Sequence, residues 1–204
     1  PTRRSSDLVA KMFQLSRLGY LKRVWSKDTD LKAQGFDTTN DALINSLSRF
    51  EYKTQTALKV TELLQTEATL TKQLYKLAAN VTKHGDFTRE RESTDNANAF
   101  LNHGNYLAYG LAATTLWVLG IPHGFAVMHG KTRRGALVFD VADLIKDAII
   151  LPWAFVCANE GATEQEFRQQ CLQSFTQHKA LDFMFEQVKN IAMHDWNDSE
   201  CTSS

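Results

Sequence analysis

The scarcity of proline limits what this chain can fold into more than any other feature of its sequence. Proline occurs three times in 204 residues, as Pro1, Pro122 and Pro152. The long stretches without proline carry apolar residues at the 3.6-residue spacing of amphipathic helices. The sequence therefore predicts an all-α fold: a compact multi-helix domain with a short irregular or extended segment near residues 121–140.

Polar segments and stop signals set the expected helix boundaries. A polar connector is expected over 26–39 and a surface loop over 83–96. Pro152 should kink its helix, and Thr163-x-x-Glu166 has the form of a capping box that begins the last one. The expected helices cover about 6–25, 41–53, 54–82, 98–119, 141–158 and 163–196. We predict a single domain over 1–196 and a disordered tail over 197–204.

The charge balance gives no general signal for binding nucleic acid. Lysine plus arginine and aspartate plus glutamate number 23 each, so the formal net charge is zero. Any binding of DNA or RNA must therefore come from a local patch. Basic residues such as Arg17 are expected on the polar side of the first helix. The hydrophobic fraction of 43% is typical of a soluble globular protein.

Several features indicate a cytoplasmic protein. The longest apolar run, over 106–121, is shorter than the ~20 residues of a membrane span, and no signal peptide is visible. Cys157, Cys171 and Cys201 have neither CxxC nor zinc-site spacing, which fits a reducing compartment. The first two are expected as small core residues. Because the chain starts without methionine, we expect a fragment or a processed product.

Residues 120–147 combine glycine with histidine, basic side chains and carboxylates. The candidate site residues in this stretch are His129, Lys131, Arg133, Arg134, Asp140 and Asp143. Such a combination suggests a site that handles phosphate with a metal. For each group there is also a plain structural interpretation.

Asp140 and Asp143 are three residues apart and would share a face of one helix. They could be the N-cap and an early helical residue, both favoured by the helix dipole. Alternatively, they could supply oxygen ligands to one Mg²⁺ or Mn²⁺. His129 could be a core or turn histidine. In a regular hairpin Asp140 would lie about 13 Å from His129, so a shared metal needs an irregular loop or Asp143 as the ligand.

Glu67 is a carboxylate inside an apolar helical stripe that includes Leu63, Leu70 and Leu74. A buried carboxylate needs a cation or a metal as partner. It could equally lie at the edge of the stripe and pair with Lys72 or with a lysine elsewhere in the chain. The two interpretations are about equal on periodicity alone.

The basic residues near the histidine could bind a polyanion whose backbone passes a metal site. Alternatively, these basic residues could lie in a solvent-exposed turn and bind nothing. Further basic residues could extend the track, namely Lys72 and Lys76 on the Glu67 helix, and Arg89 and Arg91 in the polar loop.

Several segments, in this order, resemble the C-terminal helical domain of the CRISPR-associated integrase of spacer acquisition. They are TEATLTKQLYKLAA around Glu67, NANAFLNHGNYLAYG, the GFAVMHG turn and LVFDVADLIKD. Together with the end of the chain they cover most of residues 60–195. The sequences of the second and fourth segments are similar to those of the subtype I-F members of this family.

The resemblance implies a Mg²⁺- or Mn²⁺-dependent endonuclease and integrase that inserts protospacer DNA into the repeat array by phosphoryl transfer. It implies metal ligands Glu67, His129 and Asp143, with Asp140 as an adjacent acidic helper. Lys131, Arg133, Arg134, Lys72 and Lys76 would contact double-stranded or branched DNA. The implied protein partners are a second copy and a small adaptation protein, which is fused to a helicase-nuclease in this subtype.

The family's N-terminal β-rich domain, which contributes to dimerisation, has no counterpart in this sequence. Two other functions are possible on the residues alone. His194-Asp195 could belong to an HD-type metal phosphohydrolase, or the chain could be a non-catalytic helical interaction module.

Overall fold

The computed structural model describes the chain except residues 1–2, 91, 93–94, 126, 129–134 and 195–204. The described part is helical and contains no strand, which confirms the all-α prediction. The helices are α1 Arg3–Lys27, α2 Thr29–Ala33, α3 Asp41–Thr56, α4 Val60–Val81, α5 Asn96–Val118, α6 Ala136–Ile145, α7 Leu151–Glu160, α8 Glu164–Gln177 and α9 Ala180–Ala192, with a π-helical turn, η1, over Lys146–Ile150. None of these helices has both the length and the apolar character of a membrane span.

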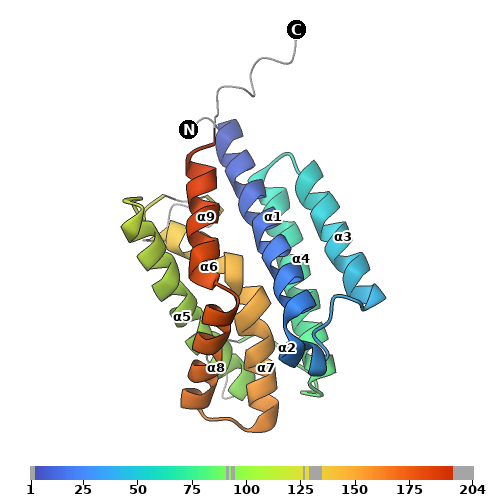
Figure 1. Ribbon diagram of the computed structural model, residues 1–204. Helices are drawn as coiled ribbons and strands as arrows, with labels where there is room; N and C mark the ends of the chain where they lie inside the picture. The colour runs from blue at the N-terminus through green and yellow to red at the C-terminus, as the bar shows by residue number, and fades with distance from the viewer. Residues whose placement is uncertain (1–2, 91, 93–94, 126, 129–134, 195–204) are drawn as a thin grey trace.

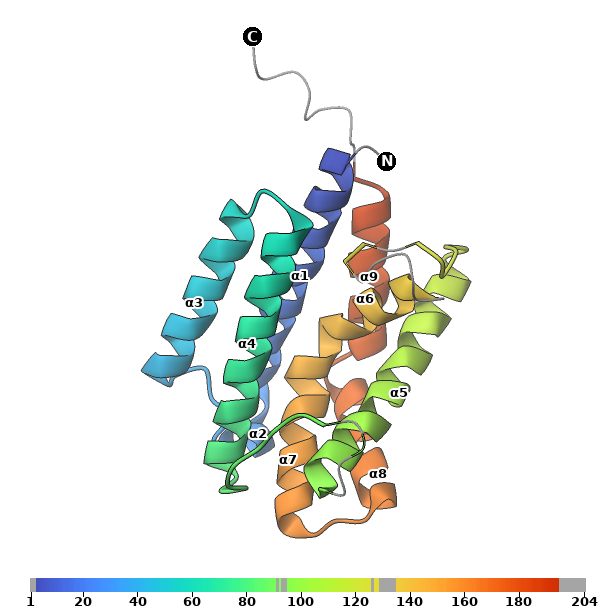
Figure 2. The same ribbon diagram turned by 180° about the vertical axis from the view of Figure 1, so that it is seen from behind.

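The helices form two groups that pack against each other (Figures 1 and 2). One group holds α1, α3 and α4, and the other holds α5, α8 and α9 with the continuous α6–η1–α7 segment. Within the second group, the α6–η1–α7 segment contacts α5 and also contacts α1 of the first group. Large buried side chains such as Trp25, Phe155 and Phe167 fill one main hydrophobic core. Cys157 and Cys171 are buried in it, as predicted.

The expected kink at Pro152 takes the form of the π-helical turn η1 just before it. Proline has no N–H to donate to the carbonyl four residues earlier, which belongs to Ala148. The indole N–H of Trp25 donates to that carbonyl instead, at 2.9 Å. The backbone N–H of Leu151 bonds to the Lys146 carbonyl, closing the wider turn. A buried side chain of α1 thus donates a hydrogen bond to the Ala148 carbonyl, which Pro152 cannot do.

The expected last helix is in fact two helices, because the chain breaks at His178 and Lys179. Lys179 adopts a left-handed conformation with φ 52°, which no regular helix allows. His178 pairs with Asp28 at 2.6 Å, and its carbonyl accepts from the Tyr20 hydroxyl at 3.3 Å. The capping box at Thr163 and Glu166 is present as predicted.

Helix α6 begins five residues earlier than expected, after Gly135 in a left-handed conformation. Residues 136–140 are therefore helical, and no hairpin forms with the described residues before them. Asp140 lies inside the helix, so its interpretation as the N-cap was wrong. The expected helix over 54–82 is also shorter, because α3 continues to Thr56 and α4 starts only at Val60.

Candidate functional site

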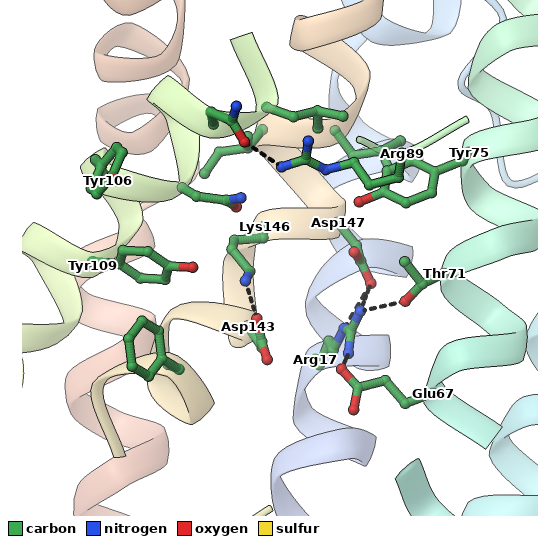
Figure 3. A pocket seen from close by; sticks show the side chains of 16 residues that line it. Arg17, Glu67, Thr71, Tyr75, Arg89, Tyr106, Tyr109, Asp143, Lys146 and Asp147 are labelled. Carbon is green, nitrogen blue, oxygen red and sulfur yellow. Dashed lines mark hydrogen bonds and ion pairs between the residues drawn. The ribbon is translucent and has the colours of Figure 1, made fainter. Parts of the chain in front are cut away.

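A polar cleft of about 960 Å³ lies between the two groups of helices (Figure 3). Its walls come from α1, α4, α5, α6 and η1, and from the loop before α5. The charged residues that line it are Arg17, Glu67, Arg89, Asp143, Lys146 and Asp147. Three cations and three carboxylates thus face one cavity, beside Tyr75, Tyr106 and Tyr109.

Arg17 is the most buried charge of the cleft, with 4% of its surface exposed. Its guanidinium donates to Asp147 and to Glu67 at 2.6 Å each, and to the Thr71 hydroxyl at 3.3 Å. Burial alone would lower the pKa of Arg17, but Asp147, Glu67 and the nearby Asp143 together raise it above its usual value. Arg17 is therefore a permanent cation that holds Glu67 on α4 and Asp147 on η1.

Lys146 forms an ion pair with Asp143, one turn earlier on the same helical segment. Its ammonium also lies 5.4 Å from the centre of the Tyr109 ring, a cation–π distance. Burial opposes the charge of Lys146, yet Asp143 raises the pKa of the lysine overall. Both Lys146 and Asp143 point into the cleft (Figure 3).

Arg89 reaches the cleft from the polar loop and is held by amides. Its guanidinium donates to the side-chain oxygens of Asn98 at 2.9 Å and Asn102 at 2.6 Å. Because amides carry no charge, these contacts fix the side chain without neutralising it. The predicted track residue Arg89 thus lies where it can attract an anion.

The cleft brings together two of the three predicted metal ligands. Glu67 from α4 and Asp143 from α6 both line it, although 76 positions separate them in the sequence. The third, His129, lies outside the described residues, as do Lys131, Arg133, Arg134 and Arg91. Lys72 and Lys76 are exposed on α4 but do not line the cleft.

Asp140 does not line the cleft and is 3% exposed. Its carboxylate accepts backbone hydrogen bonds from Val127 at 3.1 Å and Met128 at 3.3 Å. The Met128 side chain packs in a small apolar cluster with Leu63 on α4. The chain segment that ends directly before His129 is thus fixed between α4 and α6.

Arg17, Lys146 and Asp147 line the cleft but were not predicted as site residues from the sequence. Arg17 was expected on the polar side of the first helix, and the burial of its side chain shows that this prediction was wrong. The signal was present, because Phe13, Arg17, Tyr20 and Val24 follow the i, i+4, i+7, i+11 spacing of a buried face. By contrast, His194 of the HD pair is exposed beyond α9 and does not line the cleft, and Asp195 lies outside the described residues.

The donor chemistry of the cleft fits a hard divalent cation. Carboxylate oxygens are the protein ligands preferred by Mg²⁺, and Mn²⁺ also accepts an imidazole. The described residues alone do not complete such a site, since no three His, Cys, Asp or Glu side chains among them converge as ligands. Arg17 forms ion pairs with Glu67 and Asp147, and Lys146 forms one with Asp143.

Known proteins are similar to this chain in both sequence and fold. The family described as CRISPR associated protein Cas1 matches residues 10–189. A CRISPR-associated endonuclease Cas1 from Pseudomonas aeruginosa is 50% identical over 91% of this chain and 58% of that protein. The one from Pectobacterium atrosepticum is 50% identical over 88% of this chain and 56% of that protein. The chain thus spans less than two thirds of these relatives' length.

Solved structures of more distant relatives show the same fold. A Cas1 protein from Thermotoga maritima superposes with a TM-score of 0.72 at 17% identity, covering 98% of this chain and 68% of that one. The TtCas1–DNA complex gives 0.63 at 21% identity, covering 92% of this chain and 66% of that one. With the family match over most of its length and two half-identical relatives, the chain belongs to the Cas1 family of CRISPR-associated proteins.

Proposed function

We propose that this chain is the helical catalytic domain of a metal-dependent DNA endonuclease and integrase of CRISPR adaptation. The close relatives carry the name endonuclease, and a chain of the same fold has been captured with DNA. The substrate would be double-stranded or branched DNA, and the reaction would insert a protospacer 3′-OH into the repeat backbone.

The placement of Met128 is the observation that carries this proposal. Met128 lies in the same apolar cluster as Leu63, one helical turn before Glu67, and its backbone N–H donates to Asp140, one turn before Asp143. Residues one turn apart share a helix face. The residue that precedes His129 is therefore tied to the two helices that supply the other predicted ligands.

Glu67, His129 and Asp143 would hold Mg²⁺ or Mn²⁺. When bound, such an ion supplies polarisation of the scissile phosphate and stabilises charge on the leaving oxygen. Arg17 keeps the Glu67 carboxylate in the cleft, and Asp140 positions the segment that leads to His129. Arg89 adds a positive charge that favours a phosphodiester.

The basic residues outside the cleft would position the DNA backbone without reading its sequence. We assign this role to Lys131, Arg133 and Arg134 after the histidine, and to the exposed Lys72 and Lys76 on α4. The family resemblance further supports a second copy of the chain and a small adaptation protein, fused to a helicase-nuclease, as partners in the cytoplasm.

Cleavage of branched DNA in the presence of Mn²⁺ tests the proposal. Changing His129→Ala or Asp143→Ala should abolish cleavage, whereas DNA binding measured without added metal should not weaken by more than about twofold, because the basic track is retained. Asp182→Ala on the exposed face of α9 is the matched control and should cleave normally. Normal cleavage by either site variant would sink the assignment.

A further inference from the structure

The two cations that pair with the predicted ligands, Arg17 and Lys146, are held in different ways. Arg17 donates to Glu67, Asp147 and Thr71, and its side chain is 5% exposed. Lys146 has one carboxylate partner in the described part of the chain, Asp143, and its side chain is 21% exposed. Arg17 cannot move without breaking its ion pairs with two carboxylates, whereas Lys146 would break its ion pair with Asp143.

Lys146 also has space and an alternative contact within the cleft. Its flexible four-carbon stem starts on η1, and the ammonium lies between Asp143 and the Tyr109 ring (Figure 3). The cavity beside it measures about 960 Å³. A small rotation of the side chain therefore keeps the ammonium in the cleft and near Tyr109 while it leaves Asp143.

We infer that Lys146 is a displaceable counter-ion. It forms an ion pair with the Asp143 carboxylate in the metal-free protein, and a divalent cation replaces it when the metal binds. The released ammonium then binds a phosphate of the DNA in the same cleft. This inference rests on the proposed function, because it takes Asp143 as a metal ligand. It makes Lys146 a positioning residue that links the two binding events.

The charge balance of the cleft supports this role. The described lining residues supply three cations and three carboxylates, so these residues by themselves carry no excess positive charge that would attract DNA. A divalent cation on Asp143 adds two positive charges and frees a third from its ion pair. Metal and DNA should therefore bind with positive coupling, and each should raise the affinity for the other by the same factor.

A titration with Mn²⁺ alone tests whether Lys146 and the metal compete for Asp143. The free Mn²⁺ is measured at each step by its electron paramagnetic resonance signal. Lys146→Met keeps the apolar stem and removes the charge, so it should bind Mn²⁺ about tenfold more tightly than the wild type, on the scale of one lost ion pair. Lys146→Arg keeps the charge and should remain within about threefold of the wild type. Lys189→Met, on the exposed face of α9, is the control and should not change the affinity.

A second measurement separates this role from a purely structural one. The affinity for a short branched DNA should increase on adding Mn²⁺, and this increase should be smaller in Lys146→Met than in the wild type. Tighter metal binding combined with weaker coupling is a pattern that local unfolding does not produce. Circular dichroism would verify the fold, and Lys146→Gln would replace Lys146→Met if the latter does not fold.

The outcomes distinguish this inference from the proposed function. If the wild type binds Mn²⁺ and folded Lys146→Met binds it equally or more weakly, Lys146 is not a competitor and the inference is overturned alone. If the wild type binds no Mn²⁺, the metal site of the proposed function fails first, and the inference fails with it.

Discussion

The carboxylate of Asp140 accepts a hydrogen bond from the backbone N–H of Met128 at 3.3 Å, directly before His129 in the chain. Val127 donates to the same carboxylate oxygen. Asp140→Ala leaves both N–H groups without this acceptor, so the free energy of unfolding should fall by about 1–3 kcal/mol. Cleavage of branched DNA should fall as well, because the segment that leads to His129 loosens.

Asp140→Asn separates positioning from chemistry. The amide oxygen can still accept from Met128, so urea denaturation should show most of the stability restored, and cleavage should recover with it. A variant that is as stable as the wild type but does not cleave would contradict this expectation. It would favour the other prediction for Asp140, a direct acidic role beside the metal.

Arg17 should be the most costly charge to remove from this protein. Arg17→Met leaves Glu67 and Asp147 without their shared cation in a buried setting, and should lower the free energy of unfolding by about 3–5 kcal/mol. The control is Lys22→Met, which breaks the half-exposed ion pair with Glu51 and should cost at most about 1 kcal/mol. Similar losses in the two variants would show that the Arg17 network contributes little to stability.

Trp25 should stabilise the protein through its indole N–H as well as through its volume. Trp25→Phe removes the donor to the Ala148 carbonyl, which Pro152 leaves without a helical partner, and should cost about 1–3 kcal/mol or more. Trp117→Phe makes the same chemical change on a side chain that is 78% exposed. Thermal unfolding of both variants provides the measurement, and equal melting temperatures would argue against the role of this hydrogen bond.

Helix content was predictable from the sequence because periodicity and stop signals are local. The capping box at Thr163 and the interruption near Pro152 depend on residues within one or two turns. The break at His178 was missed because its causes are distant in the chain. Asp28 and Tyr20, both in or next to α1, contact His178 only once the helices have packed.

The candidate site was predictable to the extent that single residues break a pattern. Glu67 stood out because a carboxylate interrupts an apolar stripe, and this side chain does line the cleft. Arg17 was missed because its meaning depends on Asp147, which lies 130 residues away, and on Glu67, 50 residues away. A buried charge can be recognised only together with its partners, and the fold supplies these.

The basic residues Arg133 and Arg134 lie outside the described part of the chain, so their role remains a prediction from the sequence. If both contact phosphates, Arg133→Ala combined with Arg134→Ala should weaken DNA binding about equally for all sequences. The slope of log K against log salt concentration should become shallower by about 2, because each phosphate contact contributes about 0.9.

A double variant of Arg168→Ala and Lys189→Ala, both exposed and away from the cleft, removes the same net charge as a control. Since the control lowers the overall charge equally, only a direct contact explains a shallower slope in the first variant alone. An unchanged slope would show that this loop does not touch the DNA backbone.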